Sequence, residues 1–185
     1  MTDEQIIGRV RGGETRMFGE LVRRYQDPVY GMATRFVGRG EDGQDIAQEV
    51  FLRVFRGLEH FKGEARFSTW LYRITWNLCA DWLRRNRRPD RQITVVEEAG
   101  SIADGRVDLE EDLLEAEQRD AVRKALDGLD ERYRSVVVLH YYQKLSYDQI
   151  AEVLDMPVKT VETRLYRARK TLRESLEKSG RGGDA

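Results

Sequence analysis

A first run of apolar positions recurs every three or four residues and predicts an α-helix. Its members are Phe18, Leu21, Val22, Tyr25, Val29, Met32 and Phe36. Proline fits the first turn of a helix but lacks the N–H group that a helix interior requires. We therefore expect a break or kink near Asp27, just before Pro28, and an end of the unit at Gly38 and Gly40.

The next stretch, from Asp42 to about Leu58, predicts a helix with two distinct faces. One face is apolar and comprises Ile46, Val50, Phe51, Val54, Phe55 and Leu58. The other face carries Asp45, Gln48, Glu49 and Arg53. A helix of this kind buries its apolar stripe in a core and leaves the polar side chains on the surface.

Residues His60 to Phe67 have the composition of a loop. Ser68 is a suitable N-cap for a long helix from Thr69 to about Arg87, which Pro89 closes. Residues 92 to 112 mix Gly, Asp and Glu with few large apolar side chains, a composition typical of a flexible linker.

Helical spacing resumes at Leu113, Leu114, Ala121, Val122, Ala125, Leu126 and Leu129. The run from Arg134 to Tyr142 contains three consecutive valines, and its β-branched residues would suit a buried strand. We expect a helix instead, because the run stands alone among helical segments. The tail GRGGDA, from Gly180, is expected to be disordered.

A helix-turn-helix is predicted between Leu145 and Leu172. Ser146 and Gln149 form a capping box that opens a short helix, and Asp155 tolerates the left-handed conformation that must end it. The inner faces are Ile150, Ala151 and Leu154 in the first helix, and Val161, Leu165 and Ala168 in the second, which starts at Pro157 and Val158. The residues left facing outward are Lys159, Thr160, Glu162, Thr163, Tyr166, Arg167 and Lys170. Such a surface fits the major groove of DNA, although a solvated basic face is the simpler alternative.

The distribution of charge along the chain supports a different conclusion from the total charge. The chain has 185 residues, a net charge of −1 and a pI of about 6.2, which alone argues against nucleic-acid binding. However, RRNRRPDR, from Arg84 to Arg91, is strongly basic, residues 97–120 are strongly acidic, and residues 159–173 are basic again. This order indicates two binding modules joined by an acidic connector that lies away from phosphate.

The sequence lacks the residue patterns of an enzyme or a metal site. His60 and His140 are isolated, and neither an HExxH motif nor a glycine-rich phosphate loop occurs. Cys79 is the single cysteine, lies in an apolar run and is expected to be buried and inert. The start of the chain does not resemble a signal peptide, and no run approaches the ~20 apolar residues of a membrane span. We expect a cytoplasmic protein without catalytic residues, metal, cofactor or membrane insertion.

The stretch from Phe61 to Arg88 interleaves aromatic and basic side chains. The aromatic residues are Phe61, Phe67, Trp70, Tyr72, Trp76 and Trp82, and the basic ones are Lys62, Arg66, Arg73 and the cluster Arg84, Arg85, Arg87 and Arg88. Aromatic side chains beside a basic track can stack unpaired bases of single-stranded DNA. The same aromatic residues could equally form a core, and composition alone does not separate the two interpretations.

The order of these motifs resembles a known family. DGQDIAQEVFLRVFRGLEHFKGEARFSTWLYRITWN, a linker and LSYDQIAEVLDMPVKTVETRLYRARKTL together resemble bacterial RNA polymerase sigma factors, in the small extracytoplasmic-function group of the sigma-70 family. The resemblance extends from about Phe18 to Leu176. It implies an all-α fold of two small helical domains joined by a flexible acidic linker. The implied boundaries are sigma region 2 at 1–90, a linker at 91–112, sigma region 4 at 113–178 and a disordered tail at 179–185.

The resemblance also implies the roles of individual residues. Asp45, Gln48 and Glu49, with Arg53 beside them, would dock on the β′ coiled coil of core polymerase. The residues implied to bind the −10 element and single-stranded DNA are Phe61, Lys62, Arg66, Phe67, Trp70, Arg73, Trp76, Asn77, Arg84, Arg85 and Arg88. The helix from Val158, with the seven outward residues named above, would recognise the −35 element.

A sigma factor of this kind binds core polymerase, through its β′ and β subunits, and promoter DNA, and helps to melt the start site without being an enzyme. Most family members are held inactive by an anti-sigma factor, so we expect one here. The alternative is a stand-alone helix-turn-helix regulator with an N-terminal helical interaction domain, which would leave the polar QDIAQEVF face without a role.

Two residues depart from the family pattern. Asp155 stands where the family usually has glycine, and Glu162 stands where members often carry a basic residue. A carboxylate near a helix N-terminus is favoured by the helix dipole. Alternatively, Glu162 accepts a hydrogen bond from cytosine N4 in the major groove and so tunes promoter choice.

Overall fold

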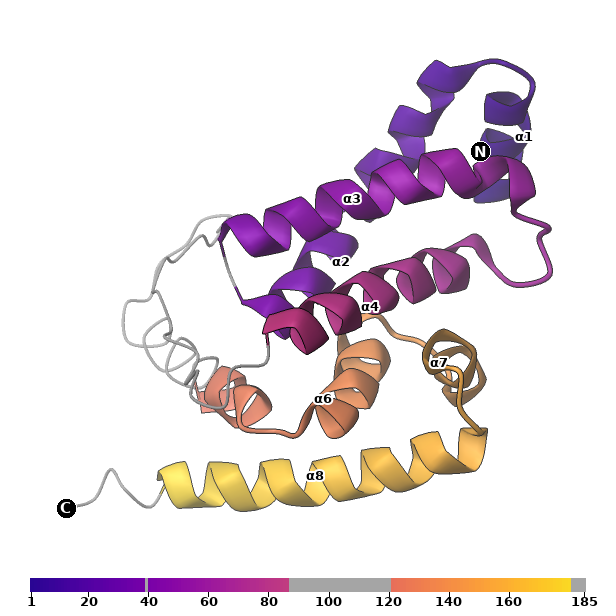
Figure 1. Ribbon diagram of the computed structural model, residues 1–185. Coiled ribbons are helices and arrows are strands. Elements are labelled where there is room, and N and C mark those ends of the chain that lie inside the picture. The colour runs from indigo at the N-terminus through magenta and orange to yellow at the C-terminus, as the bar shows by residue number, and fades with distance from the viewer. Residues whose placement is uncertain (39, 87–120, 181–185) are drawn as a thin grey trace, which may run out of the picture.

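The computed structural model describes residues 1–38, 40–86 and 121–180, and all regular structure in these ranges is helical (Figure 1). The expected all-α fold class is confirmed. The elements are α1 (Asp3–Arg11), η1 (Thr15–Met17), α2 (Phe18–Val37), α3 (Glu41–Gly57), η2 (Leu58–His60), α4 (Phe67–Asn86), a helix over 121–127, α6 (Glu131–Val137), η3 (Val138–Tyr142), α7 (Tyr147–Leu154) and α8 (Val158–Gly180). The expected linker, Arg88 and the tail beyond Gly180 lie outside the described residues, whereas Gly180 itself ends α8.

The N-terminal unit is a bundle of α2, α3 and α4, with α1 packed against α2 at one end (Figure 1). The side chains that fill it are fully buried and include Leu21, Val29, Met32, Phe36, Val50 and Leu71. Helices α2 and α3 come close together at Gly43, where an added Cβ would lie 2.9 Å from Thr34 Cγ2. The turn between the two helices uses Gly38 and Gly40 at φ of 94° and 115°, a region that side chains disfavour.

The expected break near Asp27 does not occur, because α2 continues through Pro28. The missing N–H of Pro28 removes one hydrogen bond from the helix, but Val29, Met32 and Ala33 are fully buried on the next turn. The burial of these side chains offsets the local loss and keeps the helix continuous.

Two other local expectations about the N-terminal unit are wrong. Helix α4 begins at Phe67, because Arg66 O already accepts a hydrogen bond from Trp70 N at 3.1 Å, so Ser68 lies inside the helix and is not its N-cap. Phe55 was expected in the core but is 44% exposed. Its neighbour Val54 takes the buried position, and successive helix residues point about 100° apart.

The C-terminal unit places α8 against α6 and α7. As expected, Ser146 Oγ accepts a hydrogen bond from Gln149 N, Gln149 Oε1 accepts one from Ser146 N, and Asp155 is left-handed at φ 51°. Leu154 is half-buried and packs against the core, and Val153 is buried in addition, because α7 packs against α4 as well as α8 and therefore needs a wider apolar face.

The valine-rich run is helical, as expected, but it changes type along its length. After α6, residues Val138–Tyr142 form a π-helix, in which Gln143 N donates to Val138 O, five residues earlier, at 3.2 Å. A π-segment widens the helix by one extra residue and is uncommon. It brings Tyr142 and Gln143 to the surface that meets the N-terminal unit.

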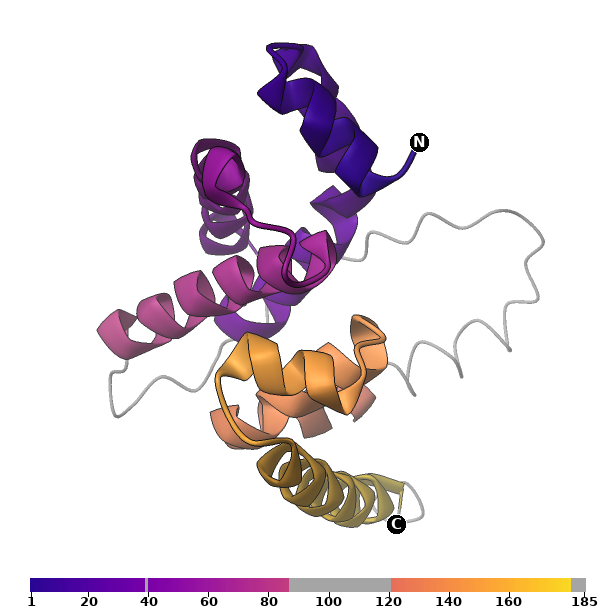
Figure 2. The ribbon, with the colours of Figure 1, turned by 90° about the vertical axis from the view of Figure 1, so that its right-hand side faces the viewer.

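The two units pack against each other (Figure 2). Helix α7 lies along α4, and η3 contacts α2. Gln143 Nε2 donates to Pro28 O at 3.2 Å, and the guanidinium carbon of Arg35 lies 3.9 Å from the centre of the Tyr142 ring. These contacts join residues more than one hundred positions apart in sequence.

Arg134 is a buried cation beside this interface. It is 6% exposed, lies 5.9 Å from the Phe36 ring of the other unit, and its Nη1 is 3.9 Å from Asp127 Oδ1. Burial lowers the pKa of Arg134 and raises the pKa of Asp127. Within the described part of the chain, Arg134 Nε has no hydrogen-bond partner. A desolvated and only partly compensated charge therefore lies beside the junction, and removing a charge from water in this way costs free energy.

Candidate functional site

The outer face of α3 carries the residues expected to dock on polymerase. Asp45, Gln48 and Arg53 are exposed and Glu49 is half-buried, with Arg53 Nε donating to Glu49 Oε1 at 2.8 Å. Leu52, which sequence reasoning missed, is 50% exposed on the same face. Its spacing of three and four residues from Glu49 and Gln48 was the available signal.

The loop between α3 and α4 is bounded by an aromatic cluster. Phe61 and Phe67 are buried, and the Phe61 ring lies 4.9 Å from the ring of Trp70 and 6.0 Å from the ring of Phe67. Tyr25 of α2 closes the cluster, 5.4 Å from Phe67. Phe61 and Phe67 therefore form core, whereas Tyr25 and Trp70 are half-buried, and Trp70 keeps an exposed edge.

The outer face of α4 combines charge, an aromatic edge and an amide. Arg66, Trp70, Arg73 and Asn77 follow one another at spacings of four, three and four residues and therefore share one side of the helix. Arg66, Arg73 and Asn77 are exposed, and the loop adds exposed Lys62. This row, with Lys62, is called the α4 stripe below.

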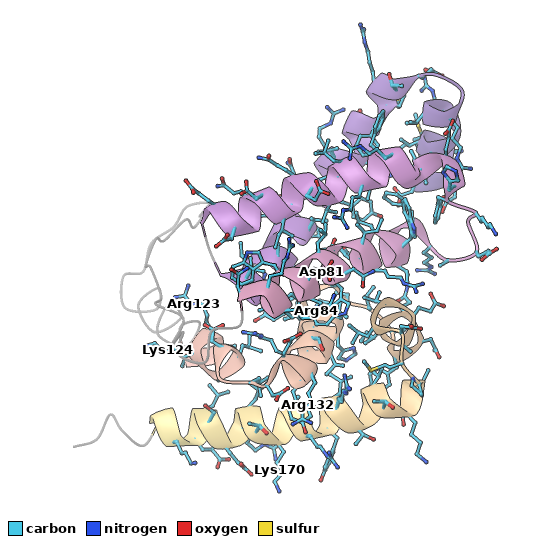
Figure 3. All side chains as sticks on the ribbon, in the orientation of Figure 1. Asp81, Arg84, Arg123, Lys124, Arg132 and Lys170 are labelled. Carbon is cyan, nitrogen blue, oxygen red and sulfur yellow. The ribbon has the colours of Figure 1, made fainter. Side chains whose placement is uncertain are left out.

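The remaining residues expected at this surface are less uniform in position. Trp76 is half-buried with its ring 5.1 Å from Phe36, and Arg85 is exposed. Arg84 forms an ion pair with Asp81, and the two are neighbours on α4 (Figure 3). Arg88 lies outside the described residues.

Helix α8 matches the expected pattern of inward and outward positions. Val161, Leu165 and Ala168 are fully buried. The outward residues Lys159, Glu162, Thr163, Tyr166, Arg167 and Lys170 are exposed, and Thr160 is half-buried. Lys170 projects from the side of α8 that faces away from the other helices (Figure 3). Thr163 Oγ1 donates to Lys159 O at 2.9 Å, which leaves the oxygen free to accept another bond.

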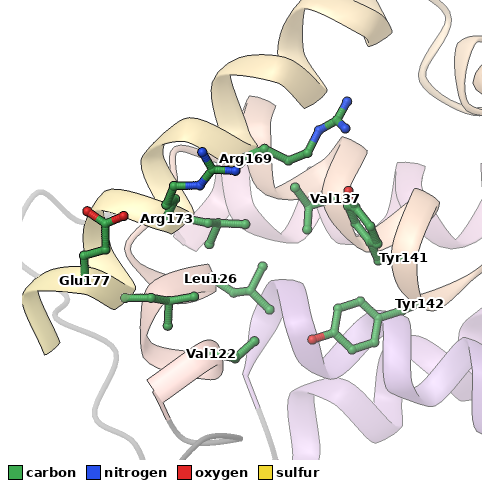
Figure 4. A pocket seen from close by; sticks show the side chains of 10 residues that line it. Val122, Leu126, Val137, Tyr141, Tyr142, Arg169, Arg173 and Glu177 are labelled. Carbon is green, nitrogen blue, oxygen red and sulfur yellow. The ribbon is translucent and has the colours of Figure 1, made fainter. Parts of the chain in front are cut away.

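A groove of about 520 Å³ lies between α8, the helix over 121–127 and the α6–η3 segment (Figure 4). Its walls are mainly apolar and consist of Val122, Leu126, Val137, Tyr141, Tyr142, Leu172 and Leu176. Arg169, Arg173 and Glu177 extend along its α8 side (Figure 4). The groove has the shape and polarity to receive an apolar side of a helix.

The described residues offer little chemistry to an enzyme. Cys79 is fully buried, and burial raises the pKa of its thiol to about 12, so thiolate is scarce at neutral pH. His140 Nδ1 lies 3.0 Å from Leu145 O, a structural contact. In the described ranges, no group of three or more His, Cys, Asp or Glu side chains could hold a metal ion. Among the helices of these ranges, none combines the length and apolar character of a membrane span.

Comparison with known proteins places both units. The Sigma-70 region 2 family matches residues 21–89, and the Sigma-70, region 4 family matches residues 119–172. The ECF RNA polymerase sigma-E factor of Haemophilus influenzae is 36% identical over 183 residues, which cover 96% of each chain. The ECF RNA polymerase sigma factor SigW of Bacillus subtilis is 35% identical over 185 residues, covering 95% of this chain and 97% of SigW.

Solved structures agree with this placement. The structure of CnrH in complex with the cytosolic domain of CnrY has a TM-score of 0.68 at 30% identity and covers 95% of this chain and 97% of CnrH. RpoE of Bartonella quintana, in a complex with the anti-sigma factor NepR, has a TM-score of 0.65 at 21% identity, which supports the fold. These matches favour a sigma factor over the alternative hypothesis of a stand-alone helix-turn-helix regulator. The chain belongs to the sigma-70 family as an extracytoplasmic-function RNA polymerase sigma factor, a non-enzymatic protein that directs transcription initiation.

Proposed function

We propose that three surfaces of this sigma factor divide the work of initiation in the cytoplasm. The α3 face docks on the β′ coiled coil of core polymerase, the α4 stripe binds the non-template strand at the −10 element, and α8 recognises the −35 element. The observation that carries the proposal is the α4 stripe, in which Trp70 lies between two arginines and Asn77 follows the second arginine on the same side of the helix.

This stripe suits single-stranded DNA. Arg66 and Arg73 can pair with successive phosphates, and the Trp70 edge and Asn77 between and beside them can contact an unpaired base. Stacking of one base on an aromatic ring contributes about 1–3 kcal/mol, comparable to the cost of opening a base-pair step. Capture of exposed bases therefore stabilises the melted promoter without nucleotide hydrolysis.

The α8 surface suits duplex DNA. Arginine forms two hydrogen bonds with guanine, lysine binds phosphate, and a carboxylate accepts from cytosine N4. Arg167 and Lys170 would supply affinity, while Glu162, Thr163 and Tyr166 would contribute sequence preference.

An inhibitory partner protein completes the proposal. We place the apolar helix of an anti-sigma factor in the groove beside α8, with acidic side chains on that helix facing Arg169 and Arg173. Both similar structures described above were determined with a partner protein bound. An inhibitor of this kind should prevent run-off transcription by holoenzyme that contains the wild-type protein. It should inhibit the Val122→Glu variant much less, because this change puts a carboxylate into the apolar groove. Equal inhibition of both proteins would remove the groove from the proposal.

The polymerase interface is tested with paired variants. Asp45→Ala with Gln48→Ala should weaken binding to core polymerase about tenfold, measured by fluorescence anisotropy of labelled sigma factor. Gln26→Ala with Asp27→Ala on α2 removes the same two side-chain types from another exposed helix surface and should leave the affinity unchanged. Equal affinities of the two double variants would refute the assignment of the α3 face.

The DNA surfaces are tested with reconstituted holoenzyme. Arg73→Ala and Asn77→Ala should reduce permanganate reactivity of thymines in the −10 region while leaving closed-complex formation intact. Arg167→Ala should instead reduce closed-complex formation on a promoter with an intact −35 element. If Arg167→Ala were the only one of these variants to reduce melting, the proposed assignment of melting to the α4 stripe and of −35 binding to α8 would be wrong.

A further inference from the structure

Helix α1 lies outside the residues that match sigma region 2, yet it contacts the segment that leads into the proposed single-strand loop. It packs beside the end of α3 from which the loop starts (Figure 1). Ile6 and Ile7 are buried, and Asp3 accepts a hydrogen bond from Tyr25 Oη at 2.5 Å and pairs with Arg24 at 2.8 Å. The helix is therefore a fixed part of the N-terminal unit.

Arg11, the last residue of α1, binds the backbone where α3 ends. Its Nε and Nη2 donate to Leu58 O at 2.9 and 2.7 Å, and Nη2 also donates to Phe61 O. Leu58 O also accepts a hydrogen bond from Phe61 N at 3.3 Å, and a cation at a helix C-terminus meets the negative end of the helix dipole. Arg11 thus holds the two carbonyl groups that bracket η2.

The bound carbonyls are connected to the base-facing surface through one aromatic ring. The Phe61 ring lies against Trp70, and Trp70 also lies across Gly57, where an added Cβ would be 3.2 Å from Trp70 Cζ2. Fixing the Phe61 backbone therefore fixes the ring that supports the exposed Trp70 edge. Among the described residues, positions 62–65 make no hydrogen bond of their own.

We propose that Arg11 is a positioning residue for promoter melting. It holds the start of the 62–65 loop and, through Phe61, the Trp70 edge, in the geometry that captures a non-template base. Arg11 touches no DNA itself. The inference rests on the proposed function of the α4 stripe and extends it to a helix outside the family match.

The experiment measures binding of single-stranded −10 oligonucleotides to the full-length protein in holoenzyme. Each nucleotide is replaced in turn by an abasic one, and affinity is measured by anisotropy. In the wild type, one abasic position should lower affinity about tenfold, by loss of a stacked base. In Arg11→Gln, the intact oligonucleotide should bind about tenfold more weakly, and that same abasic position should cause little further loss.

Two comparisons separate positioning from general destabilisation. Arg9→Gln removes an exposed arginine from the same helix. Among the described residues, the Arg9 side chain pairs only with Glu14, so this variant should behave as the wild type. Arg11→Lys keeps a cation that can reach one carbonyl, so it should give an intermediate loss at the same abasic position. A partly unfolded Arg11→Gln protein would instead show the wild-type dependence on abasic position with a smaller active fraction, and that result would overturn the inference.

The proposed function has its own readout in the same experiment. Arg66→Ala and Arg73→Ala should lower affinity for the intact oligonucleotide in an otherwise native protein. The α4 stripe does not bind the strand if two results are found together. The Arg66→Ala and Arg73→Ala variants bind the intact oligonucleotide as tightly as the wild type does, and every abasic oligonucleotide binds the wild type as tightly as the intact one. If the stripe variants lose affinity but Arg11→Gln does not, only the positioning role fails.

Discussion

Glu162 is the residue whose role the structure narrows most. It is the fifth residue of α8 and is exposed on the proposed recognition surface. The stabilising effect of the helix dipole falls off within the first turn, so it contributes little at this position. Within the described part of the chain, Glu162 forms no ion pair. Its carboxylate is therefore free to contact a base, which favours the hypothesis of cytosine recognition.

Replacing Glu162 by arginine should change the preferred −35 sequence, because arginine binds guanine and a carboxylate accepts from cytosine. We expect a preference change of about tenfold at one base position in a randomised −35 library. Glu174→Arg makes the same charge change in an exposed part of α8 that lies beyond the recognition surface. If both variants select the same sequences as the wild type, Glu162 does not determine promoter choice.

Single positions were predictable from sequence where the controlling interaction is local. Ser146 and Gln149 bond each other across the first turn of α7, and Asp155 ends the helix through its own backbone conformation. The structure places all three as expected. Phe61 and Phe67 depend on partners elsewhere, including Tyr25, forty-two residues before Phe67. Composition could not distinguish these buried rings from the exposed edge of Trp70, because all three share the same aromatic-basic surroundings.

Whole elements were predictable where apolar spacing is regular, and less so where another interaction overrides a local preference. The spacing predicted α3, α4, α7 and α8 to within a few residues. Helix α1 was missed, although Thr2 and Gln5 form a capping box before buried Ile6 and Ile7. Pro28 was expected to interrupt α2, but burial on both sides maintains the helix.

The close approach of α2 and α3 leads to a prediction about two glycines. Gly43→Ala should lower the free energy of unfolding by about 1–3 kcal/mol, because the new methyl group would lie 2.9 Å from Thr34 Cγ2. Gly8→Ala, in α1 with no atom within 4 Å of the new Cβ, should raise it by about 0.5–1 kcal/mol through helix propensity. Urea unfolding measures both changes. A stabilised Gly43→Ala protein would show that the helices separate easily at this crossing.

At the scale of the molecule, the two units are held together by few specific contacts. Pairs such as Gln143 with Pro28 join distant parts of the sequence, so no local pattern could have predicted them. Elements at −10 and −35 are about 85 Å apart along a duplex that rises 3.4 Å per base pair. The α4 stripe and α8 cannot occupy both while α7 lies against α4, so the proposed function requires the units to separate.

Weakening the contact should therefore favour the separated form. Tyr142→Ala with Gln143→Ala removes the ring under Arg35 and the hydrogen bond to Pro28, contacts that contribute about 1–2 kcal/mol together. We expect a larger radius of gyration in small-angle X-ray scattering and faster association with core polymerase. Tyr166→Ala, a change at an exposed tyrosine away from the interface, should alter neither quantity. An unchanged radius for the double variant would show that the packing of α7 on α4 is sufficient to hold the units together.

The π-helical segment η3 gives the chain a place where its length can change without turning the two units relative to each other. A π-helix accommodates one residue more than an α-helix of the same span. Deleting a single residue within Val138–Tyr142 would let α6 continue as an α-helix of that span, so the residues that follow would keep roughly their direction. A deletion inside α6 itself would instead rotate everything that follows by about 100°. Loss of one residue in these few positions is thus a simple evolutionary route by which related proteins could shorten this segment and still keep their two halves joined.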